Sequence, residues 1–580
     1  MTDSYKTALI SLISSILLLL AIIIYRYIFP KRKINLLFFL ILISLLPLIS
    51  ISGNGSYESG DLNIHAGFAM SFYQSLKDGN FIPRWSSEMI YGYGYPLFLF
   101  AYPLPYYLAA FFHFFGFSFV NSLKIILASS FILSGVTMYL FVKEEMKNKF
   151  SAFVAGIFYL FSPYHLVDLH FRVAVGETIA FSILPFCFFA IKKMFYNRTF
   201  LWFTLSAISF SLLILSHQAI SLVSLPFIIV YCLYLWTIKN RKRAKDIFFY
   251  FSPLIVSLLL SSFYWLPVIA ESKYINLLTQ GNISFVKLSQ LLYSPWRWGF
   301  LFQGPNGELS FIVGYVQWFI VGLSIIFFLK NKIPIRDRTI YLMSIISFFI
   351  LLVMTQPISS LIWSNILLLR GFQFSYRLLL LIAFFTSIIA AIIIKNSKNK
   401  LFCFLLCFIA VSTTILNWGN RKTLPQLNDS LIEYEFPRSM TKVGDSTTIW
   451  VDSNRFTSEK RLVQHLVIIR GRANVSDISR NSTRHKYLIN VLSEKADVKE
   501  NTLYFPNWIV KVDNNPYSFS FTDPDYPGVI KFSLNKGSHV VEVIFTNTFV
   551  RIFATFLSES TLLGILIYAF VAKKLNSPKP

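Results

Sequence analysis

Long apolar runs separated by short polar connectors dominate this chain. Most of these runs are long enough to cross a bilayer as a helix, and the run at 150–163 is the shortest. The runs lie near 7–29, 34–51, 120–142, 150–163, 176–192, 200–216, 219–238, 247–268, 311–329, 339–354, 374–394, 401–416 and 549–571. The pattern predicts an all-α polytopic membrane protein of about thirteen transmembrane helices.

The connectors between these runs are rich in Lys and Arg and poor in acids, so they carry most of the net positive charge. Lys and Arg gather at 31–33, 143–149, 192–198, 239–245, 330–338, 395–400 and 573–574. Because short basic connectors stay on the cytoplasmic side of a membrane, all of them are expected inside. This threading places the amino terminus outside, the carboxy terminus in the cytoplasm and Asp61 on the outer face.

One further apolar stretch, 96–115, does not fit as a span. Crossing there would move the basic connector 143–149 to the outer face, and Pro96, Pro103 and Pro105 would break a continuous helix. We therefore expect an outer loop at 52–119 that holds amphipathic helices at the membrane surface. A second outer loop is expected at 269–310, which completes a transmembrane core over 1–416.

The segment 417–548 differs from the core, because polar residues and strand-like alternation replace the apolar runs. Two alternating segments, 528–534 and 538–545, flank Asn535-Lys536-Gly537 and predict a hairpin. A further strand is expected at 509–512. The sequence predicts an extracytoplasmic β-sandwich over 417–548, followed by a final transmembrane helix and cytoplasmic tail over 549–580.

The composition agrees with a membrane protein. The 580 residues are 55% hydrophobic and 14% charged, with a mean hydropathy of +0.58. Most of the net charge of +25 lies in the connectors, and no basic stripe with interleaved stacking aromatics accompanies it, which argues against nucleic acid as a partner. The four cysteines lie within apolar runs, so we expect buried thiols and no disulfides outside.

The first candidate site begins the outer loop, where Asp61 and His65 are four residues apart and would share one helix face. A carboxylate there could act as a general base toward a hydroxyl acceptor or hold a divalent cation, and His65 could tune its proton. The alternative is that Asp61 is an ordinary helix N-cap.

A second candidate segment runs from Ser162 to Glu177 and holds His165, Asp168, Arg172 and Glu177. Polar residues at membrane depth are costly, so such a cluster suggests function. The alternative is that Arg172 pairs with an acid as a structural clamp.

Further polar residues gather at the same face and are candidates for substrate binding. These are Arg84, Trp85, His217, Glu271, Gln373 and Arg377. Arginines on an outer face run against the positive-inside bias and suggest a phosphate partner, although an isolated interfacial Arg can also extend toward lipid headgroups. Midplane charges are scarce and no phosphate-binding loop is present, which disfavours an ion-coupled or ATP-driven transporter.

In their order along the chain, several short motifs resemble a known group of proteins. They are Gly60–His65, Pro83-Arg84-Trp85, Gly92–Pro96, Ser162–His165, Arg172–Glu177, Gln373–Arg377, Tyr504–Trp508 and Lys536–His539. Together they resemble the GT-C superfamily of membrane glycosyltransferases, and more narrowly the bacterial YfhO-like proteins and those labelled "6-pyruvoyl-tetrahydropterin synthase-related".

The resemblance implies an inverting glycosyltransferase that moves a sugar from a polyprenyl-phosphate donor to a glycan or lipid acceptor on the outer face. Asp61 matches the position of the characteristic loop acid, with Glu177 as a second acid and Arg172 or Arg377 as phosphate ligands. Position 63 is Asn, so the loop lacks an Asp-x-Asp pair. Asp61 is the residue expected to bind a divalent metal if one is used.

Two other classes of function remain open on the sequence. A lipid-linked glycan transporter would use the acidic loop as a gate, and a non-catalytic envelope polysaccharide assembly protein would recruit partners through its β domain. The richness in Ile, Lys and Asn suits a bacterium with an AT-rich genome, and the expected location is the plasma membrane.

Overall fold

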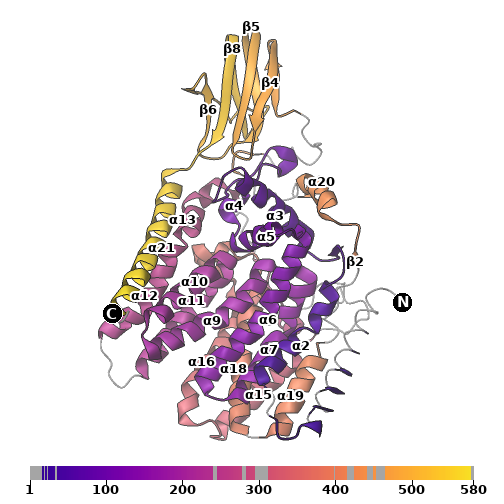
Figure 1. Ribbon diagram of the computed structural model, residues 1–580, viewed down its shortest axis with the longest axis vertical. Coiled ribbons are helices and arrows are strands. Elements are labelled where there is room, and N and C mark those ends of the chain that lie inside the picture. The colour runs from indigo at the N-terminus through magenta and orange to yellow at the C-terminus, as the bar shows by residue number, and fades with distance from the viewer. Residues whose placement is uncertain are drawn as a thin grey trace.

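The structure is a computed structural model that describes scattered positions from 9 to 32 and the ranges 35–238, 244–276, 283–293, 311–397, 399–414, 423–439, 448–451 and 464–576. The predicted span 7–29 and the predicted outer loop 269–310 lie largely outside these residues. The described chain forms a helical body with a β-sheet standing on one end (Figure 1).

The helical body contains six described helices that are long and apolar enough to cross a membrane. They are α6 (Phe119–Met146), α9 (Val175–Asn197), α11 (Gln218–Thr237), α16 (Ile335–Met354), α18 (Leu379–Ser397) and α21 (Phe549–Asn576). Two bent pairs raise the number to eight if each pair is one span. These pairs are α7 (Lys149–Leu160) with α8 (Pro163–Val167), and α12 (Ala244–Leu260) with α13 (Ser262–Glu271).

Shorter helices fill the remaining predicted spans. Those of the body are α2 (Leu36–Ser44), α10 (Phe200–Ser216), α15 (Tyr315–Leu329) and α19 (Lys400–Ser412). The small elements between them are η1 (Pro47–Ile51), η4 (Ser272–Tyr274), α14 (Leu288–Leu292), η6 (Pro357–Ser359), α17 (Ser360–Asn365), η7 (Leu367–Phe372) and η8 (Ser375–Leu378). The polytopic helical architecture is confirmed, whereas the count of thirteen spans stays a prediction.

The helices begin where polar residues interrupt the apolar pattern. The side chains of Asn35, Ser118, Asn148, Thr199 and Asn399 each accept a hydrogen bond from a backbone N–H in the first turn that follows. Such caps satisfy donors that a helix start leaves unpaired. The short polar connectors therefore set the helix boundaries.

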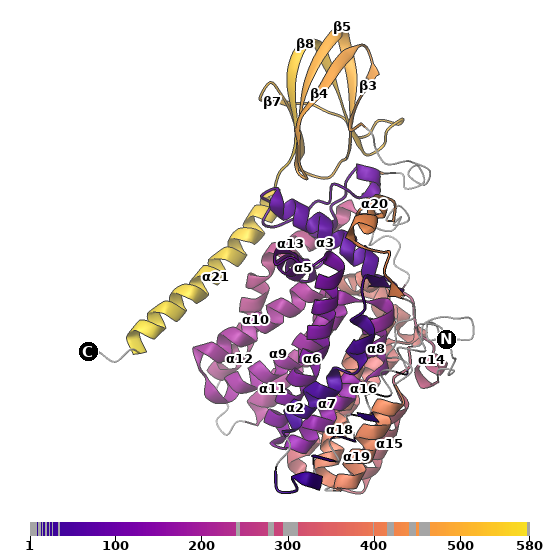
Figure 2. The ribbon, with the colours of Figure 1, turned by 45° about the vertical axis from the view of Figure 1, so that its right-hand side comes forward.

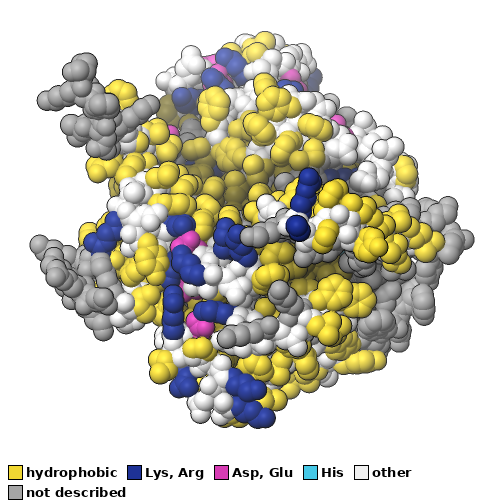
Figure 3. Space-filling view, turned by 60° about the horizontal axis from the view of Figure 1, so that its bottom comes forward, with side chains coloured by type: hydrophobic (Ala, Val, Ile, Leu, Met, Phe, Trp, Pro, Cys, Tyr) yellow, Lys and Arg dark blue, Asp and Glu magenta, His cyan; other side chains and the backbone are white. Residues whose placement is uncertain are grey.

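The described Lys and Arg side chains of the connectors gather toward the end of the body opposite the sheet, where blue and magenta side chains lie side by side (Figure 3). Lys192 lies 2.9 Å from Glu145, and Lys395 lies 2.7 Å from Asp337. Acids next to the basic connectors thus neutralise part of the charge there. This one-sided distribution is what the positive-inside pattern predicts.

The stretch that follows Asp61 forms short helices across the sheet-bearing end of the body (Figure 2). They are α3 (Leu62–Lys77), η2 (Ile90–Gly92), α4 (Leu97–Phe100) and α5 (Leu104–Phe114). As predicted, 96–115 is not a single spanning helix. One face of α5 is buried through Tyr106 and Ala109, while Phe111 and Phe114 are exposed. The helix is therefore part of the protein core as well as a surface helix.

The β domain is one antiparallel sheet of six strands in the order β3, β5, β8, β6, β7, with β4 paired to β5. The strands are β3 (Leu466–Arg470), β4 (Ala473–Arg480), β5 (Arg484–Leu503), β6 (Trp508–Val512), β7 (Asn515–Tyr517) and β8 (Val529–Phe545). The predicted strand at 509–512 is β6. The described residues form this single sheet and not the two packed sheets of the predicted sandwich. Helix α20 (Asp429–Ser439) and the small pair β1 (Ser56–Tyr57) and β2 (Thr423–Leu424) join the domain to the loop helices.

The predicted hairpin at 528–545 is wrong, because β8 runs straight through Asn535-Lys536-Gly537 as one strand. Its partner β5 is equally long, and the pairing shifts between Val491 opposite Gly537 and Lys495 opposite Asn535. A bulge in β5 absorbs the extra residues, and Gly537 adopts a φ of 141°. The residues Asn535-Lys536-Gly537 therefore form an irregularity within β8 and not a turn. The reason is that β5 is long enough for its pairing with β8 to continue beyond them.

Glu500 and His485 form a buried pair within this sheet, with His485 Nδ1 2.9 Å from a carboxylate oxygen. His485 and Arg480 hold the pKa of Glu500 below its ordinary value against the effect of burial, and burial lowers the pKa of His485. Both groups therefore favour the folded domain above their unfolded pKa values. The loss of this stabilisation begins below about pH 6.5 for His485 and below about pH 4.3 for Glu500, and it continues down to the lowered pKa of each group in the folded domain.

We expect acidification from about pH 7 to about pH 4 to lower the hydrogen-exchange protection of β5 and β8 amides by at least about tenfold. Glu500→Gln should lower protection at neutral pH and flatten the part of the response below about pH 5. Glu494→Gln is the control, because Glu494 is exposed on the same strand. An unchanged acid response in Glu500→Gln would show that this pair does not set the stability of the domain.

The last helix, α21, leaves the sheet and runs away from the body (Figure 2). Its first turn is fixed by Arg551, whose guanidinium donates to both oxygens of Glu271 at 2.7–3.1 Å. Arg551 also donates to the carbonyls of Thr546 and Pro506. This fully buried ion pair ties α13, the sheet and α21 together.

Candidate functional site

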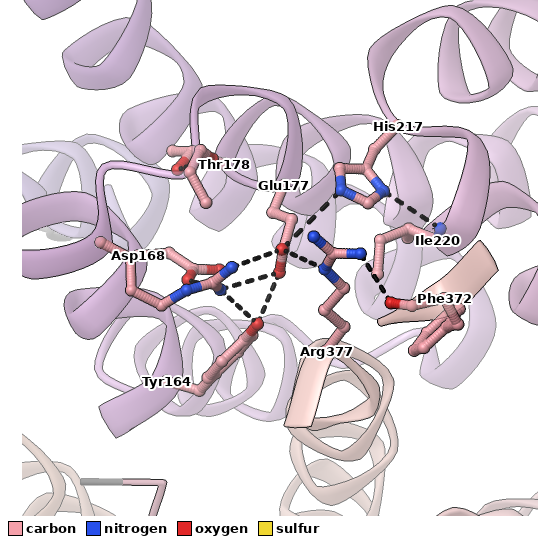
Figure 4. A network of polar contacts seen from close by, with 10 residues as sticks. Tyr164, Asp168, Glu177, Thr178, His217, Ile220, Phe372 and Arg377 are labelled. Atoms are coloured by element: carbon pink, nitrogen blue, oxygen red, sulfur yellow. Dashed lines mark hydrogen bonds and ion pairs between the residues drawn. The ribbon is translucent and has the colours of Figure 1, made fainter. Parts of the chain in front are cut away.

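A buried polar cluster centres on Glu177, in the first turn of α9. The Glu177 carboxylate accepts hydrogen bonds from Arg172, from Arg377 Nε at 3.1 Å and from the Tyr164 hydroxyl at 2.5 Å. His217 Nε2 lies 3.8 Å from the same carboxylate. Figure 4 shows Tyr164, His217 and Arg377 pointing at Glu177 from different elements.

The backbone before α9 explains how Asp168 and Arg172 reach this cluster. Pro163 starts α8, and the chain continues into a π-helical turn, η3 (Asp168–Arg172), that ends at Val173 with a φ of 55°. π-Turns of this kind occur frequently at functional sites. The turn places Arg172 Nη1 2.6 Å from Asp168 and Nη2 3.0 Å from Glu177.

Arg377 approaches the cluster from η8 and is the more accessible of the two arginines. Its Nε donates to Glu177 and its Nη1 to the Phe372 carbonyl, while Nη2 has no hydrogen-bond partner among the described residues. Tyr376 stacks on Phe311 at 4.0 Å and on Phe374 at 5.0 Å. A cation with a free donor thus lies beside an aromatic stack.

Asp61 lies next to this cluster through the backbone. The amides of Gly60 and Asp61 donate to the carbonyls of Phe171 and Arg172 at 2.7 and 3.0 Å, and a Cβ on Gly60 would lie 3.2 Å from the Arg172 carbonyl oxygen. Asp61 occupies the N-cap position of α3, but its side chain makes no capping hydrogen bond. It makes no hydrogen bond or ion pair with any other described residue, so the ordinary N-cap interpretation does not account for it.

His65 lies one turn further along α3, with Nδ1 3.0 Å from the Tyr106 hydroxyl. Burial lowers the pKa of His65, and the nearby Asp61 carboxylate partly opposes this effect. The imidazole is therefore neutral at physiological pH.

Tyr102 connects the Asp61–His65 pair with the Glu177 cluster. It is not one of the site residues predicted from the sequence. Its ring lies 4.9 Å from that of His217. Burial raises the pKa of Tyr102, and the charges of Arg377, Glu177 and Asp61 also act on its phenol. The sequence shows only an aromatic residue in a Pro-rich loop, which gives no signal of this position.

The side chains near Asp61 do not fit a divalent metal site. The Asn63 side chain accepts a hydrogen bond from Ser56, and His65 contacts Tyr106. Among the described residues, no three His, Cys, Asp or Glu side chains are grouped to hold a metal ion. In the described part of the chain, Asp61 is therefore not part of a group of metal ligands.

Three of the predicted substrate-binding residues lie in a different group beneath the sheet. Glu271 is paired with Arg551. Trp85 packs on Trp508 with ring centroids 5.2 Å apart. Arg84 donates to the Phe263 carbonyl, and burial together with the neighbouring Arg551 lowers its pKa to about 10. These contacts join the loop helices to the sheet and α21.

Two other predicted residues take no part in the Glu177 cluster. His165 is buried and stacks on Phe181 at 3.9 Å, with Nδ1 3.2 Å from the Tyr159 carbonyl. The side chain of Gln373 is exposed. The structure thus brings together Asp168, Arg172, Glu177, His217 and Arg377, with Asp61 and His65 adjacent.

Gly176 lets the elements of the site approach closely. A Cβ at this position would overlap the Ser216 carbonyl oxygen and the Tyr102 ring. We expect Gly176→Ala to lower the free energy of unfolding by about 1–3 kcal/mol, because backbone and ring must shift. Thermal unfolding in detergent measures the effect.

Gly322→Ala in α15 is the control, because no atom lies within 4 Å of a Cβ there. Alanine should leave that helix unchanged or stabilise it slightly. Equal losses in the two variants would contradict the close packing at Gly176.

The fold and the cluster define a polytopic membrane protein with a buried ion-pair network beneath a β domain. Residues 99–421 match the model of the membrane protein family described as 6-pyruvoyl-tetrahydropterin synthase related domain. More than half of the chain is covered, so the protein belongs to this family, as the motifs predicted. A relative, an uncharacterized protein of Lactococcus lactis subsp. cremoris (strain MG1363), is 26% identical over 250 residues, which are 42% of this chain and 41% of the relative.

Among solved structures, the chain is similar to two glycosyl-transferring enzymes. The arabinofuranosyltransferase AftD from Mycobacteria matches with a TM-score of 0.43 and 15% identity over 66% of this chain and 27% of AftD. The oligosaccharyltransferase of Archaeoglobus fulgidus matches with a TM-score of 0.40 and 12% identity over 69% of this chain and 55% of the enzyme. The chain therefore spans between about a quarter and about half of the length of these proteins.

Proposed function

We propose that the protein is an inverting glycosyltransferase that transfers a sugar from a polyprenyl-phosphate donor to an envelope acceptor outside the cytoplasm. The observation that carries this proposal is the unpaired carboxylate of Asp61 beside a cluster containing Arg172 and Arg377. The order of the short motifs along the chain, which resembles that of the GT-C superfamily, agrees with this proposal. The acceptor is a hydroxyl of a glycan or lipid, and the sheet-bearing end of the protein faces outside.

Asp61 acts as the general base in this proposal. A carboxylate that has no partner in the described part of the chain can accept the proton of an acceptor hydroxyl as that oxygen attacks the anomeric carbon. The bond to the donor phosphate breaks on the opposite side of the sugar, so the anomeric configuration inverts. Neutral His65 and the Tyr102 phenol lie near this carboxylate and orient the acceptor hydroxyl toward it.

Arg377 binds the phosphate that leaves. Its free Nη2 provides a donor for a phosphate oxygen, and its charge stabilises the negative charge that develops there. The stack of Phe311, Tyr376 and Phe374 offers an apolar surface for the adjacent prenyl chain. Glu177 holds both arginines in place and is a positioning residue.

The test is a transfer assay with the full chain in lipid nanodiscs, supplied with polyprenyl-phosphate sugars carrying a radioactive label. We expect labelled sugar to be released or transferred, with unlabelled polyprenyl phosphate as the other product. A lipid-linked glycan transporter would instead move intact donor across vesicles. An assembly protein would leave the donor unchanged, and either result would overturn the enzyme assignment.

A further inference from the structure

A polar cleft is lined by residues of α3, of α20 and of the β domain. Figure 1 shows α3 and α20 below the sheet. Its volume of about 580 Å³ is in the range of roughly 300–1,000 Å³ that is usual for ligand sites. Its walls are formed mainly by the second half of α3, by helix α20 and by the turn that joins β4 to β5. The lining is completed by Ser87, Glu88, His113, Phe119 and His465. None of the residues of the Glu177 cluster lines it.

The contact between the sheet and α3 fixes one edge of this cleft. Asp78 accepts a hydrogen bond from the Ser482 amide at 2.8 Å, and Asn80 donates to the Ser482 hydroxyl at 3.1 Å. Thr483 donates to Asn80 at 3.3 Å. The turn between β4 and β5 is therefore held on the end of α3, and the cleft is built by this docking.

The charges that line the cleft disfavour an anionic ligand. Its acidic side chains outnumber its basic ones, and one of the bases, Arg480, already donates to Glu500 and Tyr487. The acids are Asp78, Glu88, Asp429 and Glu433, and the bases are Lys77 and Arg480. A phosphate or an acidic lipid headgroup would be repelled here.

The remaining lining combines aromatic faces with hydrogen-bonding groups. Tyr73, His113 and Phe436 are aromatic, and Gln74 and Asn481 carry exposed amides. Tyr73 is held by an edge-to-face contact with His113 at 4.7 Å. A sugar ring presents C–H groups that pack on aromatic faces and hydroxyls that bond to amides and carboxylates.

We infer that this cleft binds a neutral glycan, which is the remote part of the acceptor. The role of this glycan as the acceptor rests on the proposed function, whereas the binding of a glycan in the cleft does not depend on that function. The cleft begins near Met70, which is about 14 Å along α3 from Asp61 at 1.5 Å per residue. One sugar ring cannot reach both places, so the glycan is an oligosaccharide whose reacting end lies at Asp61.

The experiment uses neutral oligosaccharides released by mild acid from the envelope of the producing cell, carrying a fluorescent label. Binding to the full chain in nanodiscs is measured by polarisation. Tyr73→Ala should weaken binding at least about tenfold, and Gln74→Ala by about threefold to tenfold through a lost hydrogen bond. Tyr293→Ala is the control, because Tyr293 is 64% exposed and lies outside the cleft.

Any of three results would overturn the inference. They are a lack of saturable binding, binding that neither cleft variant changes, and displacement of the oligosaccharide by excess inorganic phosphate. Gln74 is exposed at the surface of α3, so its variant stays informative if Tyr73→Ala fails to fold. Oligosaccharide binding that depends on the cleft residues, without any sugar transfer, would refute the enzyme assignment and support the glycan site. Sugar transfer that neither cleft variant changes would support the enzyme and refute the glycan site.

Discussion

Asp61→Asn is expected to lower the rate of sugar transfer by about 10²- to 10⁴-fold, which is the usual contribution of a general base. The same change should leave the thermal unfolding of the protein unaltered. The reason is that the Asp61 side chain makes no capping hydrogen bond to α3 and no ion pair with a described residue. Rate and unfolding temperature, measured on the same nanodisc sample, separate catalysis from stability.

Asp513→Asn is the matched control, because Asp513 is a half-exposed acid of the β domain that pairs with His539. It should retain full transfer. Normal turnover in Asp61→Asn would remove Asp61 from the mechanism, and a large loss of stability would show that its carboxylate has a structural partner.

Glu177→Gln is expected to lower the free energy of unfolding by about 3–5 kcal/mol, the usual cost of removing one partner from a buried ion pair. Glu177 is 1% exposed and lies between Arg172 and Arg377. Without its charge, the two guanidinium groups would repel one another in a site that water cannot screen. Thermal unfolding in detergent measures the loss.

Two further variants test this explanation. Glu144→Gln removes an acid that pairs with Lys147 and Lys193 in a more exposed place, so about 0–1 kcal/mol is expected. Removing the charge of Arg377 together with that of Glu177 should recover part of the stability. If the double variant is as unstable as the sum of the single ones, repulsion between the arginines is not the cause.

The periodicity of the chain predicted the helical body well, because burial in lipid requires long apolar runs with internally satisfied backbones. It also predicted the broken stretch 96–115 as separate short helices, since prolines cannot continue a helix. It did not predict that β8 passes through Asn535-Lys536-Gly537 without turning. The local turn preference was overridden by pairing with β5, which lies far enough away in the sequence that no local pattern reveals it.

The candidate site was predicted as a set of residue types and only partly as an arrangement. Asp168, Arg172 and Glu177 are close in sequence, and their clustering was visible. Arg377 joins them from 200 residues away, and Tyr102 links them to Asp61 without any chemical signature of its own. Arg84 and Glu271 have the same polar character, but the structure places them in a separate group with Arg551.

The sequence by itself determined that this protein is a polytopic membrane protein with basic connectors between its apolar runs, because hydropathy and the distribution of Lys and Arg are properties of composition and order. Only the tertiary structure decided which polar residues meet. Among the residues that the structure describes, it left the Asp61 carboxylate unpaired and used the Glu271 carboxylate in an ion pair. The physical reason is that a buried charge must find a partner in space, and the packing of distant helices decides where that partner lies.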